Sequence, residues 1–67
     1  MLKETRYKIE LPRDNCGRHF VLAVNQLGAI CSIDKIYMAT AFTEAEMRDN
    51  VQRAQLRDYF LIRVEAV

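Results

Sequence analysis

The chain has 67 residues, 51% of them hydrophobic, and its ten Lys and Arg against nine Asp and Glu give a formal net charge of +1. This length is enough for one domain spanning residues 1–67, and the apolar content excludes a disordered chain. The near-neutral charge argues against a strongly basic nucleic-acid binder and equally against an acidic mimic of DNA.

The first residues bear on where the protein resides. Residues 1–6 carry charges where a secretory signal peptide would need an apolar core, and no run approaches the ~18 apolar residues of a membrane span. We therefore expect a cytoplasmic protein that makes no contact with a membrane. In a reducing compartment, Cys16 and Cys31 are expected to be free thiols.

The first half of the chain has the pattern of three strands in a meander. Residues 5–11 alternate between apolar and charged side chains, the period of a half-buried strand, and residues 12–17 are dense in turn formers. Residues 18–25 are apolar on both faces, which is typical of a central strand or of a strand covered on both sides. After a turn at residues 25–28, residues 29–33 complete the meander.

A helix-start signal follows at Thr43. Its hydroxyl can cap the first helical turn and the Glu46 carboxylate can reach back to the Thr43 amide, which together form a capping box. Phe42 can pack on Met47 as a hydrophobic staple. We expect the helix over residues 44–56, with a narrow apolar stripe that consists of Met47, Val51 and Ala54.

The last segment alternates again. Residues 59–67 are expected to form a final strand. Residues 36–41 are expected to be extended, as a continuation of the third strand, a short separate strand or a lead into the helix. The element order β-β-β-α-β predicts an α+β fold, in which a small antiparallel sheet carries one helix packed on one face. If the third and last strands run parallel, the connection through the helix is right-handed.

The alternation in the strands divides the predicted sheet into two faces. We expect the helix to cover Tyr7, Ile9, Phe20, Leu22, Val24, Phe60, Ile62 and Val64. The opposite face mixes apolar, aromatic and cationic side chains, and Tyr and Arg are enriched at protein interfaces. This face supplies the candidate partner-binding residues, which are Arg6, Lys8, Val21, Tyr59, Leu61 and Arg63. An ordinary solvated face, and a homodimer through this face or an edge strand, are the open alternatives.

No motif for catalysis, metal binding or nucleotide binding stands out. His19 is the only histidine, and the sequence alone singles out no Ser-His-Asp or Cys-His grouping around it. Cys16-x-x-His19 and Cys31-x-x-Asp34 offer four potential zinc ligands, but this spacing is weak evidence and Asp is a less usual fourth ligand. We therefore expect no enzyme, no catalytic residue, no metal site and no cofactor.

Nucleic-acid binding is the alternative from a different class. Basic residues cluster in the N-terminal hairpin, and aromatic side chains on a sheet can stack on bases. Acidic residues are interleaved with them, and no RNP-like sequence is present. The basic residues of this alternative are Arg6, Lys8, Arg13 and Arg18.

The helix start carries a resemblance to known proteins. The segment Ala41-Phe42-Thr43-Glu44-Ala45-Glu46-Met47, with a meander before it and a strand after it, resembles compact proteins of bacteriophages and other mobile elements. These include small phage inhibitors of host RNA polymerase and several anti-CRISPR proteins. The resemblance is architectural and carries no binding residue over. It implies a non-enzymatic protein that inhibits a host macromolecular complex by steric occlusion.

Overall fold

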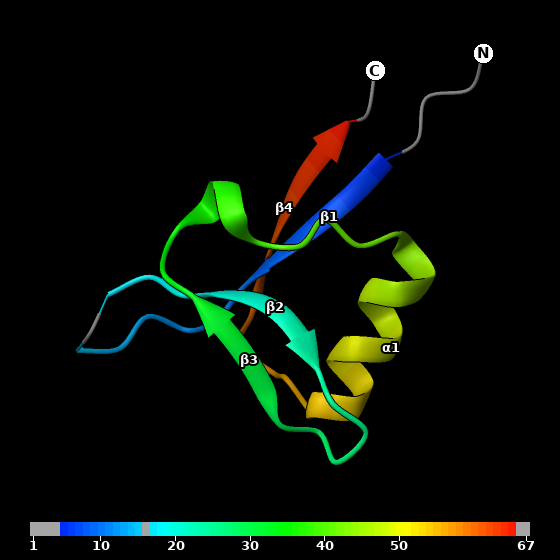
Figure 1. The fold of residues 1–67 in the computed structure, drawn as a ribbon, viewed down its shortest axis with the longest axis horizontal. Coiled ribbons are helices and arrows are strands. Elements are labelled where there is room, and N and C mark those ends of the chain that lie inside the picture. Colours follow the sequence, from blue (N-terminus) through cyan, green and yellow to red (C-terminus); the bar gives the residue numbers. More distant parts are fainter. Residues whose placement is uncertain (1–4, 16, 66–67) are drawn as a thin grey trace.

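Four strands, one α-helix and a short 3-10 helix make up the computed structural model, which describes residues 5–15 and 17–65 (Figure 1). In chain order they are β1 (Thr5–Glu10), β2 (Phe20–Val24), β3 (Ile30–Ile33), η1 (Ile36–Met38), α1 (Glu44–Ala54) and β4 (Phe60–Glu65). The strands form one antiparallel sheet in the order β3-β2-β1-β4. The predicted α+β fold, β-β-β-α-β with one helix on a small antiparallel sheet, is confirmed.

One local expectation needs correction. Residues 36–38, predicted to be extended, form the single 3-10 turn of η1. The strands β3 and β4 lie at opposite edges of the sheet and run antiparallel, so the condition for a right-handed connection between them is not met.

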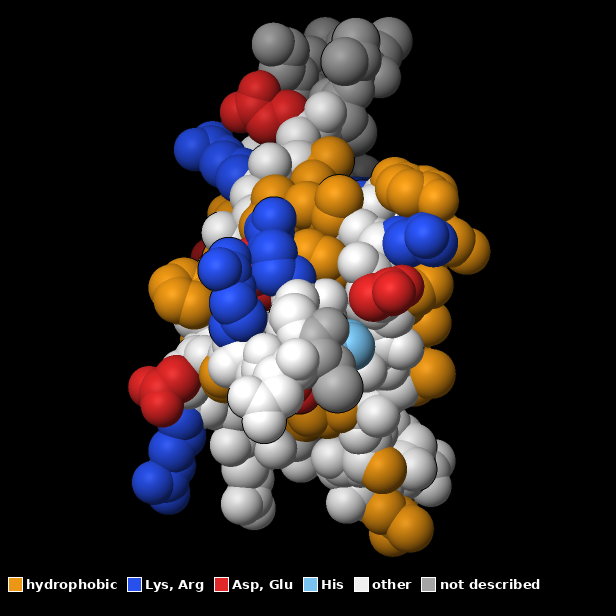
Figure 2. Space-filling model, turned by 90° about the vertical axis from the view of Figure 1, so that its left-hand side faces the viewer, with side chains coloured by type: hydrophobic (Ala, Val, Ile, Leu, Met, Phe, Trp, Pro, Cys, Tyr) orange, Lys and Arg blue, Asp and Glu red, His pale blue; other side chains and the backbone are white. Residues whose placement is uncertain are grey.

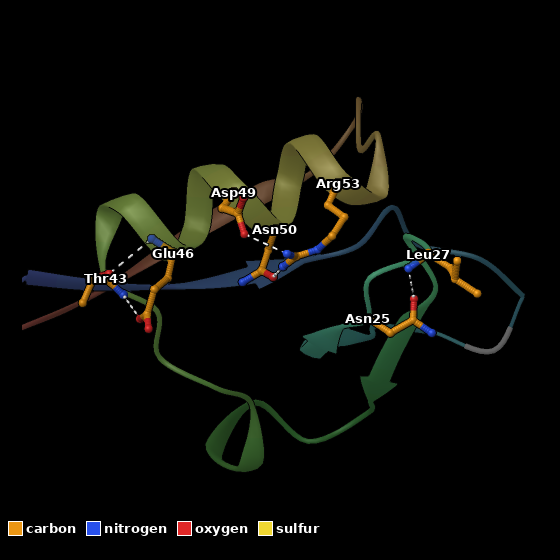
Figure 3. A network of polar contacts seen from close by, with 7 residues as sticks. All are labelled: Asn25, Leu27, Thr43, Glu46, Asp49, Asn50 and Arg53. Atoms are coloured by element: carbon orange, nitrogen blue, oxygen red, sulfur yellow. Dashed lines mark hydrogen bonds and ion pairs between the residues drawn. The ribbon is translucent and has the colours of Figure 1, made fainter.

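The capping box at the start of α1 is confirmed. The Glu46 backbone N–H donates to Thr43 Oγ1 at 3.2 Å, and the Thr43 N–H donates to Glu46 Oε1 at 3.0 Å (Figure 3). This hydrogen bond from the Thr43 backbone lowers the pKa of the Glu46 carboxyl. The helix ends two residues earlier than predicted, where Gln55 takes the left-handed conformation that closes many helices.

An extra residue in β2 explains why residues from both phases of its alternation, Val21 and Val24, enter the same core. The pairing of β2 with β3 shifts between Val21 and Ala23, and this β-bulge leaves Leu22 without an opposite residue. Because side chains alternate along a regular strand, the bulge puts Val21 and Val24 on the same side of the sheet. The hydrophobic core under α1 consists of Ile9, Val21, Val24, Phe42 and Met47.

The chain between β3 and α1 crosses the side of β1 that faces away from α1, as Figure 3 shows for η1. Further on, this connection pairs with β1: the Tyr7 N–H donates to Phe42 O at 2.7 Å, and the Phe42 N–H donates to Tyr7 O at 2.8 Å. The ladder between β1 and β2 is short, with Glu10 opposite Phe20. Phe42 therefore occupies a place beside β1 that β2 leaves free.

The turn between β2 and β3 packs against the end of α1. Asn25 Oδ1 accepts a hydrogen bond from the Leu27 N–H, which Figure 3 shows, and another from the Ala29 N–H, and these bonds fold the turn on itself. Gly28 in this turn has φ +86°, and a Cβ at this position would lie 2.6 Å from the Arg53 carbonyl oxygen. Glycine is therefore required here for both backbone conformation and space.

We expect Gly28→Ala to lower the free energy of unfolding by roughly 3 kcal/mol, because positive φ and overpacking each add a cost. Gly17→Ala is the matched control. Gly17 also has positive φ, +98°, but a Cβ added there would have no atom within 4 Å, so backbone strain of about 1 kcal/mol is the expected cost. Urea unfolding of both variants measures the difference, and equal losses would contradict the close contact with Arg53.

Replacing Thr43 with Ala is expected to lower the free energy of unfolding by about 1 kcal/mol, because the Glu46 N–H loses its side-chain acceptor. Thr43→Ser keeps the hydroxyl and should stay close to the parent protein in chemical denaturation. A Ser variant as unstable as the Ala variant would show that the hydroxyl contributes nothing.

Candidate interaction surface

The six residues predicted to bind a partner do not share one face of the sheet. Leu61 pairs with Ile9, a core residue under α1, so Leu61 and Arg63 lie on the helix side of the sheet. Arg6 and Lys8 alternate with Ile9 along β1 and lie on the other side. The prediction of a single surface is therefore wrong.

The remaining two of the six residues pack inward. Val21 is fully buried in the core, and Tyr59 packs against the core cluster. The predicted cover of β4 is also wrong, because Phe60 is 64% exposed and lies opposite Glu10, on the side away from α1. Alternation in β4 predicts its apolar phase under the helix, but the register with β1 pairs Phe60 with Glu10 and Ile62 with Lys8, on the side away from α1.

Exposed apolar side chains gather on the side of the sheet away from α1. The residues of η1 lie there, with Ile36, Tyr37 and Met38 exposed by 39%, 74% and 52%. Lys8 joins η1 to the strands, because its Nζ donates to Ile36 O at 2.7 Å. We call this surface the η1 face, and it consists of Lys8, Arg18, Ile36, Tyr37, Met38 and Phe60.

A view of one side of the molecule shows how charge and apolar groups mix. In Figure 2, Lys and Arg side chains gather near the middle of the surface, and hydrophobic side chains lie on several sides of them. The 3-10 turn of η1 could not be predicted from the sequence, because the three residues Ile36–Met38 are too few to show a helical period. The available signal was an apolar run directly after the polar pair Asp34-Lys35.

An ion pair over a buried ring fixes one part of the η1 face. Arg18 Nε and its NH2 group each donate to a different carboxylate oxygen of Glu10, both at 2.9 Å. The guanidinium also lies 5.2 Å from the ring centroid of Phe20, whose side chain is 2% exposed. The hydrogen bond from Arg18 lowers the pKa of the Glu10 carboxyl against the opposing effect of burial. Glu10 is therefore held as a charged carboxylate with its partner in place.

The basic residues of the N-terminal hairpin are mostly bonded within the chain. Besides Lys8 and Arg18, the Arg6 guanidinium donates to Ala41 O at 3.2 Å. Three of the four cations proposed to bind nucleic acid thus already hold acceptors of the fold, which leaves fewer of their donors for phosphate groups.

A second polar cluster lies on α1 (Figure 3). Arg53 pairs with Asp49 at 2.9 Å and donates to Asn50 Oδ1 at 2.6 Å. Asp49 and Arg53 are four residues apart, the spacing of a helix-stabilising pair. This cluster has a structural explanation and is no candidate site.

The loop end of β1 and β2 has a shallow pocket of about 340 Å³, lined by Leu11, Pro12, Asp14, His19 and Ser32. His19 Nε2 lies 3.7 Å from Asp14 Oδ1. Asp, His and Ser are the residue types of a hydrolytic triad, but no hydrogen bond joins Ser32 to His19 in the described structure.

The zinc hypothesis finds one of its ligands outside the described residues. Cys16 lies there, so its place relative to His19 and Cys31 is not part of the structure. Within residues 5–15 and 17–65, no group of three or more His, Cys, Asp or Glu side chains is placed to hold a metal ion.

No protein-family model, curated protein or solved structure matches this chain. These comparisons give no support to the resemblance to proteins of mobile elements, which stays an expectation from the sequence. In the described part of the chain, no helix has the length and apolar character needed to cross a membrane.

Replacing Glu10 with Gln is expected to destabilise the protein at pH 7 and to matter less in acid. The folded-state pKa of Glu10 is lowered, so its contribution is present above the ordinary carboxyl pKa of about 4.3 and is lost as pH falls through the lowered value. Thermal unfolding at pH 7 and pH 3 measures this, and the gap between parent and variant should shrink at pH 3.

Glu44→Gln is the control for this measurement. It removes an exposed ion pair with Arg48, which is expected to cost no more than about 0.5 kcal/mol at pH 7. A gap between Glu10→Gln and the parent protein that stays constant with pH would contradict the role of the Glu10 charge.

Proposed function

We propose that this chain is a non-enzymatic binding domain that attaches to another protein through the η1 face. One observation carries the proposal: large exposed apolar side chains gather on one side of the sheet, around Lys8 and Arg18. Aromatic side chains, Met and Arg are the residue types enriched at protein interfaces, and Tyr37, Met38 and Phe60 are among the most exposed large side chains of the described chain.

The chemistry of the η1 face describes the partner that it suits. Its apolar residues favour a partner with an apolar patch of its own. Binding of this kind acts by covering a surface. In its narrower form, the proposal is that the covered surface belongs to a host macromolecular complex, which the protein inhibits by steric occlusion.

An affinity pull-down tests the proposal. The tagged protein is incubated with a bacterial lysate, with and without nuclease, and captured proteins are identified by mass spectrometry. The amount of a protein complex captured by the double variant Tyr37→Ser, Met38→Ser should be at least tenfold lower than with the parent protein, because two exposed apolar contacts are removed.

Leu27→Ser is the control, because Leu27 is 93% exposed in the turn between β2 and β3, away from η1. It should capture the same complex as the parent protein. Capture that disappears with nuclease would favour the nucleic-acid alternative. Capture unaffected by the double variant would show that the η1 face is not the binding surface.

A further inference from the structure

In the sheet formed by the described residues, the strand β4 is at one edge and pairs with β1. Its two first residues, Phe60 and Leu61, are exposed by 64% and 42%. An edge strand of six residues presents a row of backbone donors and acceptors, which is a template for a further strand.

The hydrogen bonds of Tyr7 show which groups of β4 point outward. Both its N–H and its C=O bond to Phe42, on the side of β1 away from β4. Tyr7 lies opposite Arg63, so these two residues exchange no backbone hydrogen bond, and the N–H and C=O of Arg63 point away from β1. By alternation, the backbone groups of Leu61 point outward as well.

We propose that the outer edge of β4 pairs with the same edge of a second copy of this chain, antiparallel about a two-fold axis beside Ile62. Most oligomers of identical chains are closed by such an axis, and a strand paired antiparallel with its own copy satisfies it. Leu61 of each copy then lies opposite Arg63 of the other, and these two residues exchange the outward backbone hydrogen bonds. The result is one continuous sheet through both copies.

Charge selects this register from its neighbour. The two-fold axis can lie beside either of the two central residues of β4, Ile62 or Arg63. In both registers, residues whose backbone groups point outward lie opposite each other and can exchange hydrogen bonds. The axis beside Arg63 would place two guanidinium groups directly opposite each other, which is destabilising. The axis beside Ile62 avoids this and leaves the contact between Arg63 and Glu65 within each chain, at 3.5 Å, undisturbed.

The side chains on both sides of the proposed interface are compatible. On the side away from α1, Ile62 meets Ile62 of the second copy and Phe60 meets its Val64, which extends an apolar stripe across the axis. On the helix side, Leu61 lies against the aliphatic stem of Arg63 of the second copy.

The other edge of the sheet is less suited to such pairing. The strand β3 has four residues, and its central pair, Cys31 and Ser32, is exposed and lacks large apolar side chains. The proposed dimer uses backbone groups of β4, which Ile36, Tyr37 and Met38 do not supply, and Phe60 is the one residue that it shares with the η1 face. Tyr37→Ser, Met38→Ser should remain dimeric.

Disulfide cross-linking tests the register directly. In a background of Cys16→Ser and Cys31→Ser, Ile62→Cys places two thiols opposite each other at a pair that is not hydrogen-bonded, where Cβ atoms are about 4.5–5.5 Å apart. Oxidised glutathione supplies the oxidant. We expect Ile62→Cys to form covalent dimers at least tenfold faster than Leu27→Cys in the same background.

Sedimentation equilibrium of the parent protein up to about 0.5 mM should give twice the mass of one chain. Arg63→Pro removes an outward N–H without breaking a bond to β1, and should raise the dimer dissociation constant at least tenfold. A monomeric parent protein, or equal cross-linking of Ile62→Cys and Leu27→Cys, would overturn the proposal. The cross-linking result is decisive even if Arg63→Pro unfolds.

Discussion

The fold depends on the backbone pair between Tyr7 and Phe42. The strand β1 leaves β2 after a short ladder, and without Phe42 its inner edge would expose unbonded N–H and C=O groups to the core. Phe42 supplies these bonds, and its side chain, 7% exposed, fills the same core. Because Thr43 caps α1 immediately afterwards, the bond to β1 also sets where the helix begins on the sheet. One residue thus joins the sheet, the core and the helix.

The parts of the fold that local sequence specifies could be predicted, and the parts that depend on pairing could not. Thr43 and Glu46 form their capping box within four residues, so the sequence contains the whole interaction. The facing of Val21 depends on a bulge, which arises from the pairing of β2 with β3 and leaves no local signal. The facing of Phe60 depends on the register with β1, which pairs Phe60 with Glu10 and which the alternation within β4 does not contain.

In the candidate surface, too, some features could be predicted from local sequence and others depend on long-range contacts. The sequence indicated a face with Arg6 and Lys8, and both do lie on the side of the sheet away from α1. It could not indicate that η1 crosses that side, because this placement rests on long-range bonds. Lys8 binds the Ile36 carbonyl, and the Thr40 hydroxyl donates to Leu22 O at 2.7 Å, at the bulge. Contacts between residues 18 to 28 positions apart are invisible to a pattern read over a short window.

The pairing of β1 with β4 has a consequence for how the protein is made. Thr5 lies opposite Glu65, so the longest ladder of the sheet joins residues from the two ends of the described chain. During synthesis, β1 leaves the ribosome long before β4 exists, and until then its outer edge has no strand to bond. Closing so distant a pair is slow relative to local structure. The sheet therefore cannot be completed until β4 has left the ribosome.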